Sequence, residues 1–77
     1  MTSQGELKKV TSDIELLEAE LFSNVEEIER INPLGDEYIK RERYLRLRNT
    51  RLEENLKELR TKKKSLIDYI DWEKRTS

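Results

Sequence analysis

Two pairs of adjacent carboxylates, Glu26-Glu27 and Glu53-Glu54, are the first residues in this sequence that could do chemistry. Paired carboxylates can act as general acid and base, but only where a pocket shifts their pKa. Both pairs lie in strongly charged, helix-forming stretches that offer no such pocket. The chain also lacks histidine and cysteine, which removes the usual general base, the thiolate nucleophile and the commonest metal ligands. We therefore expect no enzyme, no catalytic residue, no metal or cofactor site and no small-molecule ligand.

A basic segment offers a second kind of chemistry, electrostatic contact with phosphate groups. Five of its side chains could contact DNA or RNA: Lys40, Arg43, Arg46, Arg48 and Arg51. Tyr44 could stack on a base among them. The chain as a whole carries a net charge of −1, whereas nucleic-acid modules are usually strongly basic. Nucleic-acid binding is therefore the alternative function, and the other interpretation is a solvated helix face that pairs with acidic residues.

A short stretch beside this segment resembles a known chromatin motif. Pro33-Leu34-Gly35-Asp36, followed by Arg41, Arg43 and Tyr44, resembles the Pro-Leu-Gly-x-Asp-Arg…Arg-Tyr-Trp signature of WHIM-type motifs in chromatin-remodelling subunits. The resemblance implies a chromatin-associated helical module. It covers about a dozen residues, Leu45 stands where the signature has Trp, and the spacing differs by one residue. No family is assigned on it.

The elements that would position these side chains are indicated by a heptad repeat from Leu7 to Ile70. With position a at Leu7, fourteen of the nineteen a and d positions are apolar, in a chain that is 34% hydrophobic and 43% charged. This pattern is typical of a coiled coil. The expected core residues are Leu7, Ile14, Leu17, Leu21, Asn24, Ile28, Leu45, Asn49, Leu52, Leu56, Leu59 and Leu66.

The fold predicted from this pattern is all-α, an antiparallel coiled-coil helical hairpin. The first helix is expected over 6–31, the turn over 32–36 around Pro33 and Gly35, and the second helix over 36–72. Capping boxes starting at Ser3 or Ser12 could begin the first helix. Residues 1–5 are expected to be disordered and 73–77 to form a tail, so 6–72 would be a single unit.

The two seam asparagines select one register of this hairpin. If residues whose numbers sum to 73 lie opposite each other, Asn24 meets Asn49 and the remaining core positions meet apolar partners. A buried amide without a partner costs about 1–3 kcal/mol, so matching the two amides favours this register. A register summing to 66 closes the turn more easily but places Asn24 against Glu42. The alternative fold is a long parallel coiled-coil dimer kinked at Pro33, which the unbroken heptad phase permits.

Several large apolar side chains lie outside the seam and are expected to bind a partner: Phe22, Tyr44, Leu47, Tyr69 and Trp72. Residues 1–36 carry a net charge of −6 and residues 37–77 of +5, so charge could set the orientation of partners. We predict a non-enzymatic protein–protein interaction module that oligomerises, as a homodimer, or serves as a scaffold or adaptor subunit in a helical assembly. No membrane-spanning or secretory pattern is visible, which predicts an intracellular protein, cytoplasmic or nuclear, without a membrane partner.

Overall fold

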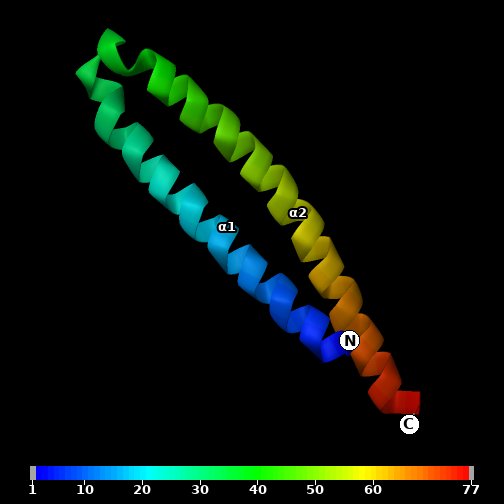
Figure 1. Cartoon of the computed structure of the whole chain (residues 1–77). Coiled ribbons are helices and arrows are strands. Elements are labelled where there is room, and N and C mark those ends of the chain that lie inside the picture. Colours follow the sequence, from blue (N-terminus) through cyan, green and yellow to red (C-terminus); the bar gives the residue numbers. More distant parts are fainter. Residues whose placement is uncertain (1, 77) are drawn as a thin grey trace.

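The structure, a computed structural model, describes residues 2–76. Two long helices, α1 (Ser3–Ile31) and α2 (Ile39–Thr76), are joined by two short 3-10 helices, η1 (Asn32–Leu34) and η2 (Asp36–Tyr38). Figure 1 shows the two long helices antiparallel and side by side, with the two ends of the chain at the same end of the molecule. The molecule measures 61 × 17 × 15 Å. The predicted helical hairpin is confirmed, and the chain does not fold as the kinked rod.

The first helix begins earlier than the sequence suggested. Thr2 is extended, and its Oγ1 accepts a hydrogen bond of 3.0 Å from the backbone N–H of Gly5. The capping residue is therefore Thr2, and the expected caps at Ser3 and Ser12 were wrong because an earlier hydroxyl fills the role. Residues 3–5 are helical and not disordered, while Met1 lies outside the described residues.

The turn depends on one backbone conformation. Gly35 has φ 88° and ψ −155°, the only positive φ among residues 2–76. This region is open essentially only to glycine, because a Cβ would clash with the backbone. Pro33 lies within η1, where its missing N–H is tolerated, and the carbonyl of Gly35 accepts a 3.2 Å bond from the N–H of Tyr38.

The second helix is shifted toward the C-terminus relative to the prediction. It begins at Ile39 and continues to Thr76, so most of the expected tail is helical, and Ser77 lies outside the described residues. No glycine or proline follows Trp72 to stop it. Arg75 pairs with Asp71 at 3.1 Å, and the hydroxyl of Thr76 donates to the carbonyl of Trp72. These local contacts support the last turn.

The core is a single stripe shared by the two helices. Six apolar residues are buried: Val10, Ile14, Ile31, Leu45, Leu52 and Leu56. Leu52 is fully enclosed at 0% exposure. The other predicted core positions are half-buried, because two helices can cover only one side of each other: Leu7, Leu17, Leu21, Asn24, Ile28, Asn49, Leu59 and Leu66.

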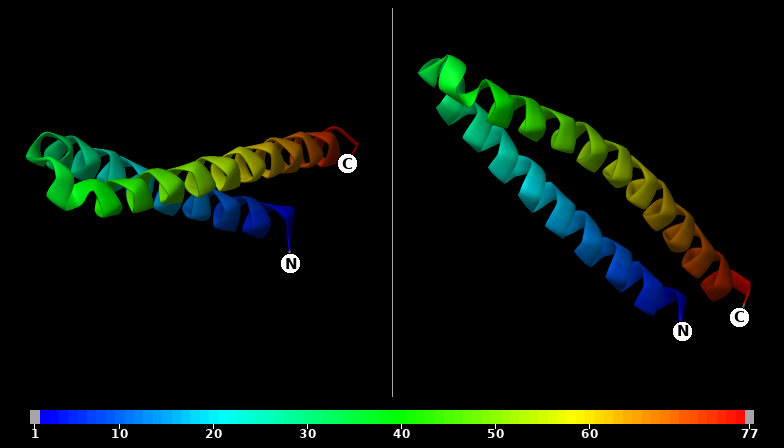
Figure 2. Two further views of the ribbon diagram at one scale, coloured as in Figure 1. Left: turned by 90° about the horizontal axis from the view of Figure 1, so that it is seen from above. Right: turned by 45° about the horizontal axis from the view of Figure 1, so that its top comes forward.

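The register that the asparagines favoured is the one the chain adopts. The side-chain Nδ2 of Asn24 donates to Oδ1 of Asn49 at 3.0 Å. Val10, Ile14 and Leu56 form the centre of the apolar cluster, packed against Leu17, Leu21, Leu59 and Leu66. Figure 2 shows α2 continuing past the start of α1, because α2 is 38 residues long and α1 is 29. Contact between the helices nevertheless continues to Glu73, whose Oε1 accepts a 3.4 Å hydrogen bond from the hydroxyl of Ser3.

Candidate interaction surfaces

Two long faces flank the seam, one on each side. In a helix, heptad positions b and e lie beside a, whereas c and g lie beside d. We call the b and e side the Phe22 face, and the c and g side the Tyr44 face. Each of these two faces contains a surface hollow, the first on the Phe22 face and the second on the Tyr44 face. The first is lined by Val25, Ile28, Glu29, Arg46, Asn49, Thr50 and Glu53, and the second by Asp13, Leu16, Leu17, Asn55, Glu58 and Leu59.

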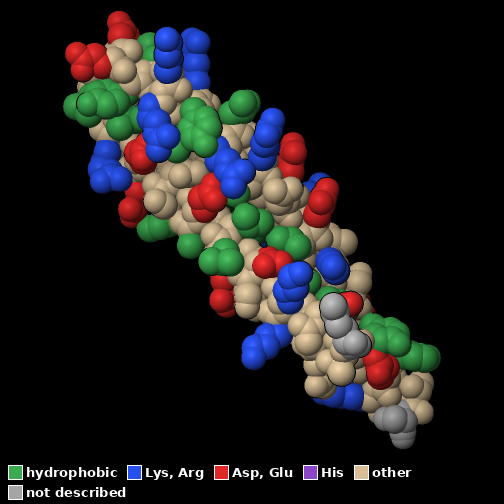
Figure 3. Space-filling model, in the orientation of Figure 1, with side chains coloured by type: hydrophobic (Ala, Val, Ile, Leu, Met, Phe, Trp, Pro, Cys, Tyr) green, Lys and Arg blue, Asp and Glu red, His purple; other side chains and the backbone are tan. Residues whose placement is uncertain are grey.

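The five predicted partner-binding residues are all exposed, but they do not form one surface. Phe22 lies on the Phe22 face, Tyr44, Tyr69 and Trp72 on the Tyr44 face, and Leu47 on the outer side of α2 between them. Tyr69 and Trp72 stack with ring centroids 5.9 Å apart. At 1.5 Å per residue, Tyr69 lies about 38 Å and Trp72 about 42 Å along α2 from Tyr44. Figure 3 likewise shows hydrophobic side chains in separate places, with charged ones between them.

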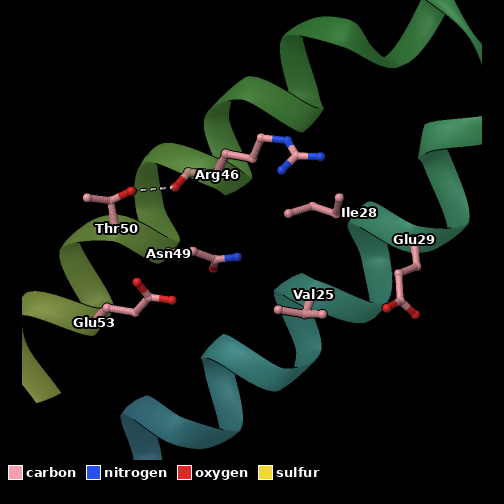
Figure 4. Close-up of a pocket in the computed structure, with 7 residues that line it drawn as sticks. All are labelled: Val25, Ile28, Glu29, Arg46, Asn49, Thr50 and Glu53. Carbon is pink, nitrogen blue, oxygen red and sulfur yellow. Dashed lines mark hydrogen bonds between the residues drawn. The ribbon is translucent and has the colours of Figure 1, made fainter.

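The Phe22 face contains a hollow of about 420 Å³ at the junction of the helices. Figure 4 shows Val25 and Ile28 of α1 opposite Asn49 of α2, with Arg46 and Glu53 on either side of it. Glu29 and Thr50 also line the hollow, but they lie on the outer flanks of their helices. The hydroxyl of Thr50 donates to the carbonyl of Arg46, so that side chain turns back on its own helix. The floor of the hollow is apolar on the α1 side and its rim is charged. Such a site fits a protruding apolar side chain with charged neighbours.

The Tyr44 face is crossed by two ion pairs between the helices. Arg48 donates to Glu20 through Nε at 2.6 Å and through an Nη at 3.2 Å, and Arg41 binds Glu27 with the same two distances. The hydrogen bond from Arg48 lowers the pKa of Glu20, partly opposed by desolvation, and Arg41 acts in the same way on Glu27. The Arg41 guanidinium also lies 5.4 Å from the centroid of the Tyr44 ring.

The basic residues considered for phosphate contact divide into two groups. Arg46 pairs with Glu42 at 2.7 Å and Arg48 pairs with Glu20, so both have protein partners. Lys40 and Arg43 line a shallow hollow on the outer side of α2, together with Tyr44, Arg46, Leu47 and Thr50. Arg51 is exposed one turn further on. The five side chains therefore do not converge on a single groove.

Sequence reasoning missed three features of these surfaces. Val10 and Ile31 occupy apolar seam positions opposite Lys63 and Glu42 and were not among the predicted core residues, yet they are only 3% and 9% exposed. Lys63 and Glu42 are themselves half-buried, as expected of long side chains that bury their aliphatic stems and keep their charged ends in water. Tyr38 occupies a seam position in the heptad pattern but is 38% exposed, because the seam ends at the turn.

Two further features are absent from the described residues, a cluster of metal ligands and a membrane-spanning helix. Within residues 2–76, no three acidic side chains lie together in a way that could hold a metal ion. No helix in that range is long and apolar enough to span a membrane. The fold and its surfaces therefore define an all-α helical hairpin with exposed apolar side chains on several sides. Comparison with known protein families, curated proteins and solved structures finds no match to this chain.

Proposed function

We propose that this protein is a non-enzymatic protein–protein interaction module, a coiled-coil hairpin that self-associates or docks in a larger helical assembly as a scaffold or adaptor. One observation carries the proposal. Among the described residues, eleven large apolar side chains are 37–69% exposed, whereas only six residues are buried. The exposed ones are Leu16, Phe22, Val25, Leu34, Tyr38, Ile39, Tyr44, Leu47, Ile67, Tyr69 and Trp72.

The energetics of a two-helix unit support this proposal. A chain of this size buries too little surface to be more than marginally stable, and such chains usually gain further burial from a partner. Exposed aromatic and aliphatic side chains on a rigid helix are typical anchors for that burial. The charge difference between the two halves of the chain favours a partner with a matching pattern and sets its orientation.

Nucleic-acid binding, the alternative, has weaker support. Two of its five candidate side chains, Arg46 and Arg48, already bind carboxylates of the same chain. Releasing them for phosphate would break these pairs. Lys40, Arg43 and Arg51 remain available, but they give only a small basic patch beside the exposed Tyr44 and Leu47.

Photo-crosslinking in the cells that produce the protein tests the proposal directly. A photoreactive amino acid placed at Leu47 or Trp72 of the full chain is expected to give protein adducts that protease removes and nuclease does not. The same group at Glu54, an exposed polar position on the outer side of α2, serves as the matched control. Adducts sensitive to nuclease would support the nucleic-acid alternative. The interaction module is refuted if neither position gives adducts above the control and the purified chain is monomeric.

A further inference from the structure

We propose that the Phe22 face is the interface with a second copy of this chain, in a dimer whose twofold axis runs parallel to the helices. In this dimer both turns lie at the same end, and α1 of each copy packs on α2 of the other. Phe22 of each copy enters the hollow beside Asn49 of the other. This inference rests on the proposed function, because it names the partner and the surface.

Charge decides between the two symmetric ways of stacking the same face. An axis parallel to the helices places the acidic α1 of one copy on the basic α2 of the other. An axis across the helices, with the turns at opposite ends, would place α1 on α1 and α2 on α2. Acidic residues would then face acidic ones and basic residues basic ones, and like charges across an interface are unfavourable. Charge complementarity therefore selects the arrangement with the turns together.

The register of this arrangement follows from the hairpin. A rotation about an axis parallel to the helices does not move any residue along the helix direction. The register within one hairpin therefore also applies between the copies, and residue n of α1 faces about residue 73 − n in α2 of the second copy. Among residues at heptad position b, the pairs that lie closest in height across this interface are those whose residue numbers sum to 72. Glu15 then meets Lys57, and Glu29 meets Arg43. Between these two ion pairs, Phe22 meets Thr50, which lines the hollow.

The four charged side chains that form these contacts have no ion-pair partner in the described part of their own chain. Within residues 2–76, Glu15, Glu29, Arg43 and Lys57 form no ion pair with another side chain of the chain. The Phe22 face carries one ion pair between its own helices, Glu18 with Arg60 at 3.5 Å, but it leaves these four charges unpaired. On the Tyr44 face, the carboxylates at the centre are already bound by Arg41 and Arg48. A second copy therefore gains new ion pairs on the Phe22 face that it would not gain on the Tyr44 face.

Size and shape also fit a second copy. Phe22 is 67% exposed and protrudes from α1, while the hollow lies on the same face of the molecule, over Val25 and Ile28. Symmetry gives two such contacts. The two longest dimensions of the hairpin, 61 and 17 Å, define a face of about 1,000 Å². Stable interfaces bury about 800 Å² on each partner, so this face is large enough.

One contact in this register is unfavourable and provides a sharp check. Lys8 meets Lys64 near the open end of the dimer, where both ammonium groups can turn toward water. Exchanging Lys64 for Glu converts this like-charge contact into an ion pair. We expect Lys64→Glu to lower the dimer dissociation constant by about twofold to fivefold, in line with an exposed ion pair.

The first experiment measures the dissociation constant of the purified full chain by sedimentation equilibrium and light scattering. The wild-type chain is expected to be a dimer, and Phe22→Ala to raise the dissociation constant by about tenfold or more, as truncation of an interface aromatic does. Leu16→Ala is the matched control, because Leu16 is 69% exposed on the same helix but on the Tyr44 face. Circular dichroism verifies that both variants remain helical. A monomeric wild type, or equal effects of the two substitutions, overturns the proposal.

Charge reversal tests the register. Glu29→Arg and Arg43→Glu are each expected to weaken the dimer, and the double variant is expected to recover most of the lost affinity. Glu26→Arg, on the outer side of α1, is the control for a general effect of charge. Failure of the double variant to recover any affinity overturns the Glu29–Arg43 contact and the register with it.

A single spin label tests the orientation. The natural chain has no cysteine, so Leu34→Cys places one label at the turn of each copy. With turns together, the labels lie within about 30 Å, the width of four helices spaced 8–10 Å apart with their label arms. With turns at opposite ends, the separation approaches the 61 Å length of the molecule. The longer distance overturns this dimer but leaves the proposed function, which the crosslinking experiment decides independently.

Discussion

The hydrogen bond between Asn24 and Asn49 gives the most direct test of the pairing between the helices. Its Nδ2 to Oδ1 distance is 3.0 Å, and both side chains are half-buried in the seam. A double-mutant cycle with Asn24→Ala, Asn49→Ala and the double variant isolates the energy of this pair. The gain in helix propensity from Ala, up to about 0.7 kcal/mol at each site, cancels in the cycle.

The expected magnitude follows from the burial of the two amides. A net hydrogen bond contributes about 0.5–1.5 kcal/mol, and a fully buried amide left unpaired costs about 1–3 kcal/mol. Because water can still reach a half-buried amide, each single substitution should cost about 0.5–1.5 kcal/mol. The double variant should be more stable than the sum of the singles predicts by about 1 kcal/mol. For a chain of this size, 1 kcal/mol corresponds to about 4–8 °C in the melting temperature.

The assay is urea and thermal unfolding followed by circular dichroism at one fixed chain concentration, since association shifts apparent stability. Asn55→Ala is the control, because Asn55 is exposed and should change stability by less than about 0.5 kcal/mol. Strict additivity of the two seam substitutions, within about 0.3 kcal/mol, would falsify the pairing and with it the register that sums to 73.

Three further predictions follow from the same structure. Gly35→Ala should destabilise the fold by about 1–3 kcal/mol in urea unfolding, because its φ of 88° is open essentially only to glycine. The strain comes from the local backbone, since no atom beyond the neighbouring residues lies within 4 Å of the added Cβ; unchanged stability would contradict the turn. Leu52→Ala should cost about 2–5 kcal/mol because Leu52 is 0% exposed, whereas Leu16→Ala should cost less than about 0.5 kcal/mol; similar melting curves for the two would refute the assigned core. Because Arg48 lowers the pKa of Glu20, this pair stabilises the fold above the usual carboxyl pKa of 4.5, and the stabilisation is lost as the pH falls through the lower folded-state pKa. Glu20→Gln should therefore unfold more easily than wild type at pH 7 and equally easily near pH 2, and a difference that persists in acid would contradict this assignment.

The heptad pattern determined the helices and their pairing because these depend on the spacing of apolar residues along one chain. Leu45, Leu52 and Leu56 are the most deeply buried residues, and each occupies a predicted seam position. The two asparagines could be matched in advance because an amide in an apolar seam has few ways to be satisfied. Pro33 and Gly35 marked the turn because their backbone preferences act locally.

The ends of the helices were less predictable, because several residues compete for each role. Thr2, Ser3 and Ser12 could all cap α1, and the choice was made by the geometry of the first turn. At the other end, ordinary helix-forming residues continue to Thr76, and no local signal near Trp72 specified where α2 would stop.

The sequence by itself determined the helical segments and favoured one register, because a seven-residue spacing of apolar residues and two matched amides are local features of the chain. It left the parallel dimer kinked at Pro33 open, and the fold decided for the hairpin. Only the tertiary structure decided how the remaining side chains are grouped. It separated Phe22 from Tyr44, Tyr69 and Trp72 by placing them on opposite sides of the seam, although all four are exposed aromatics in the sequence. It also paired Arg48 with Glu20 across the helices. Such contacts depend on how two helices wind on each other, and one-dimensional spacing does not specify that.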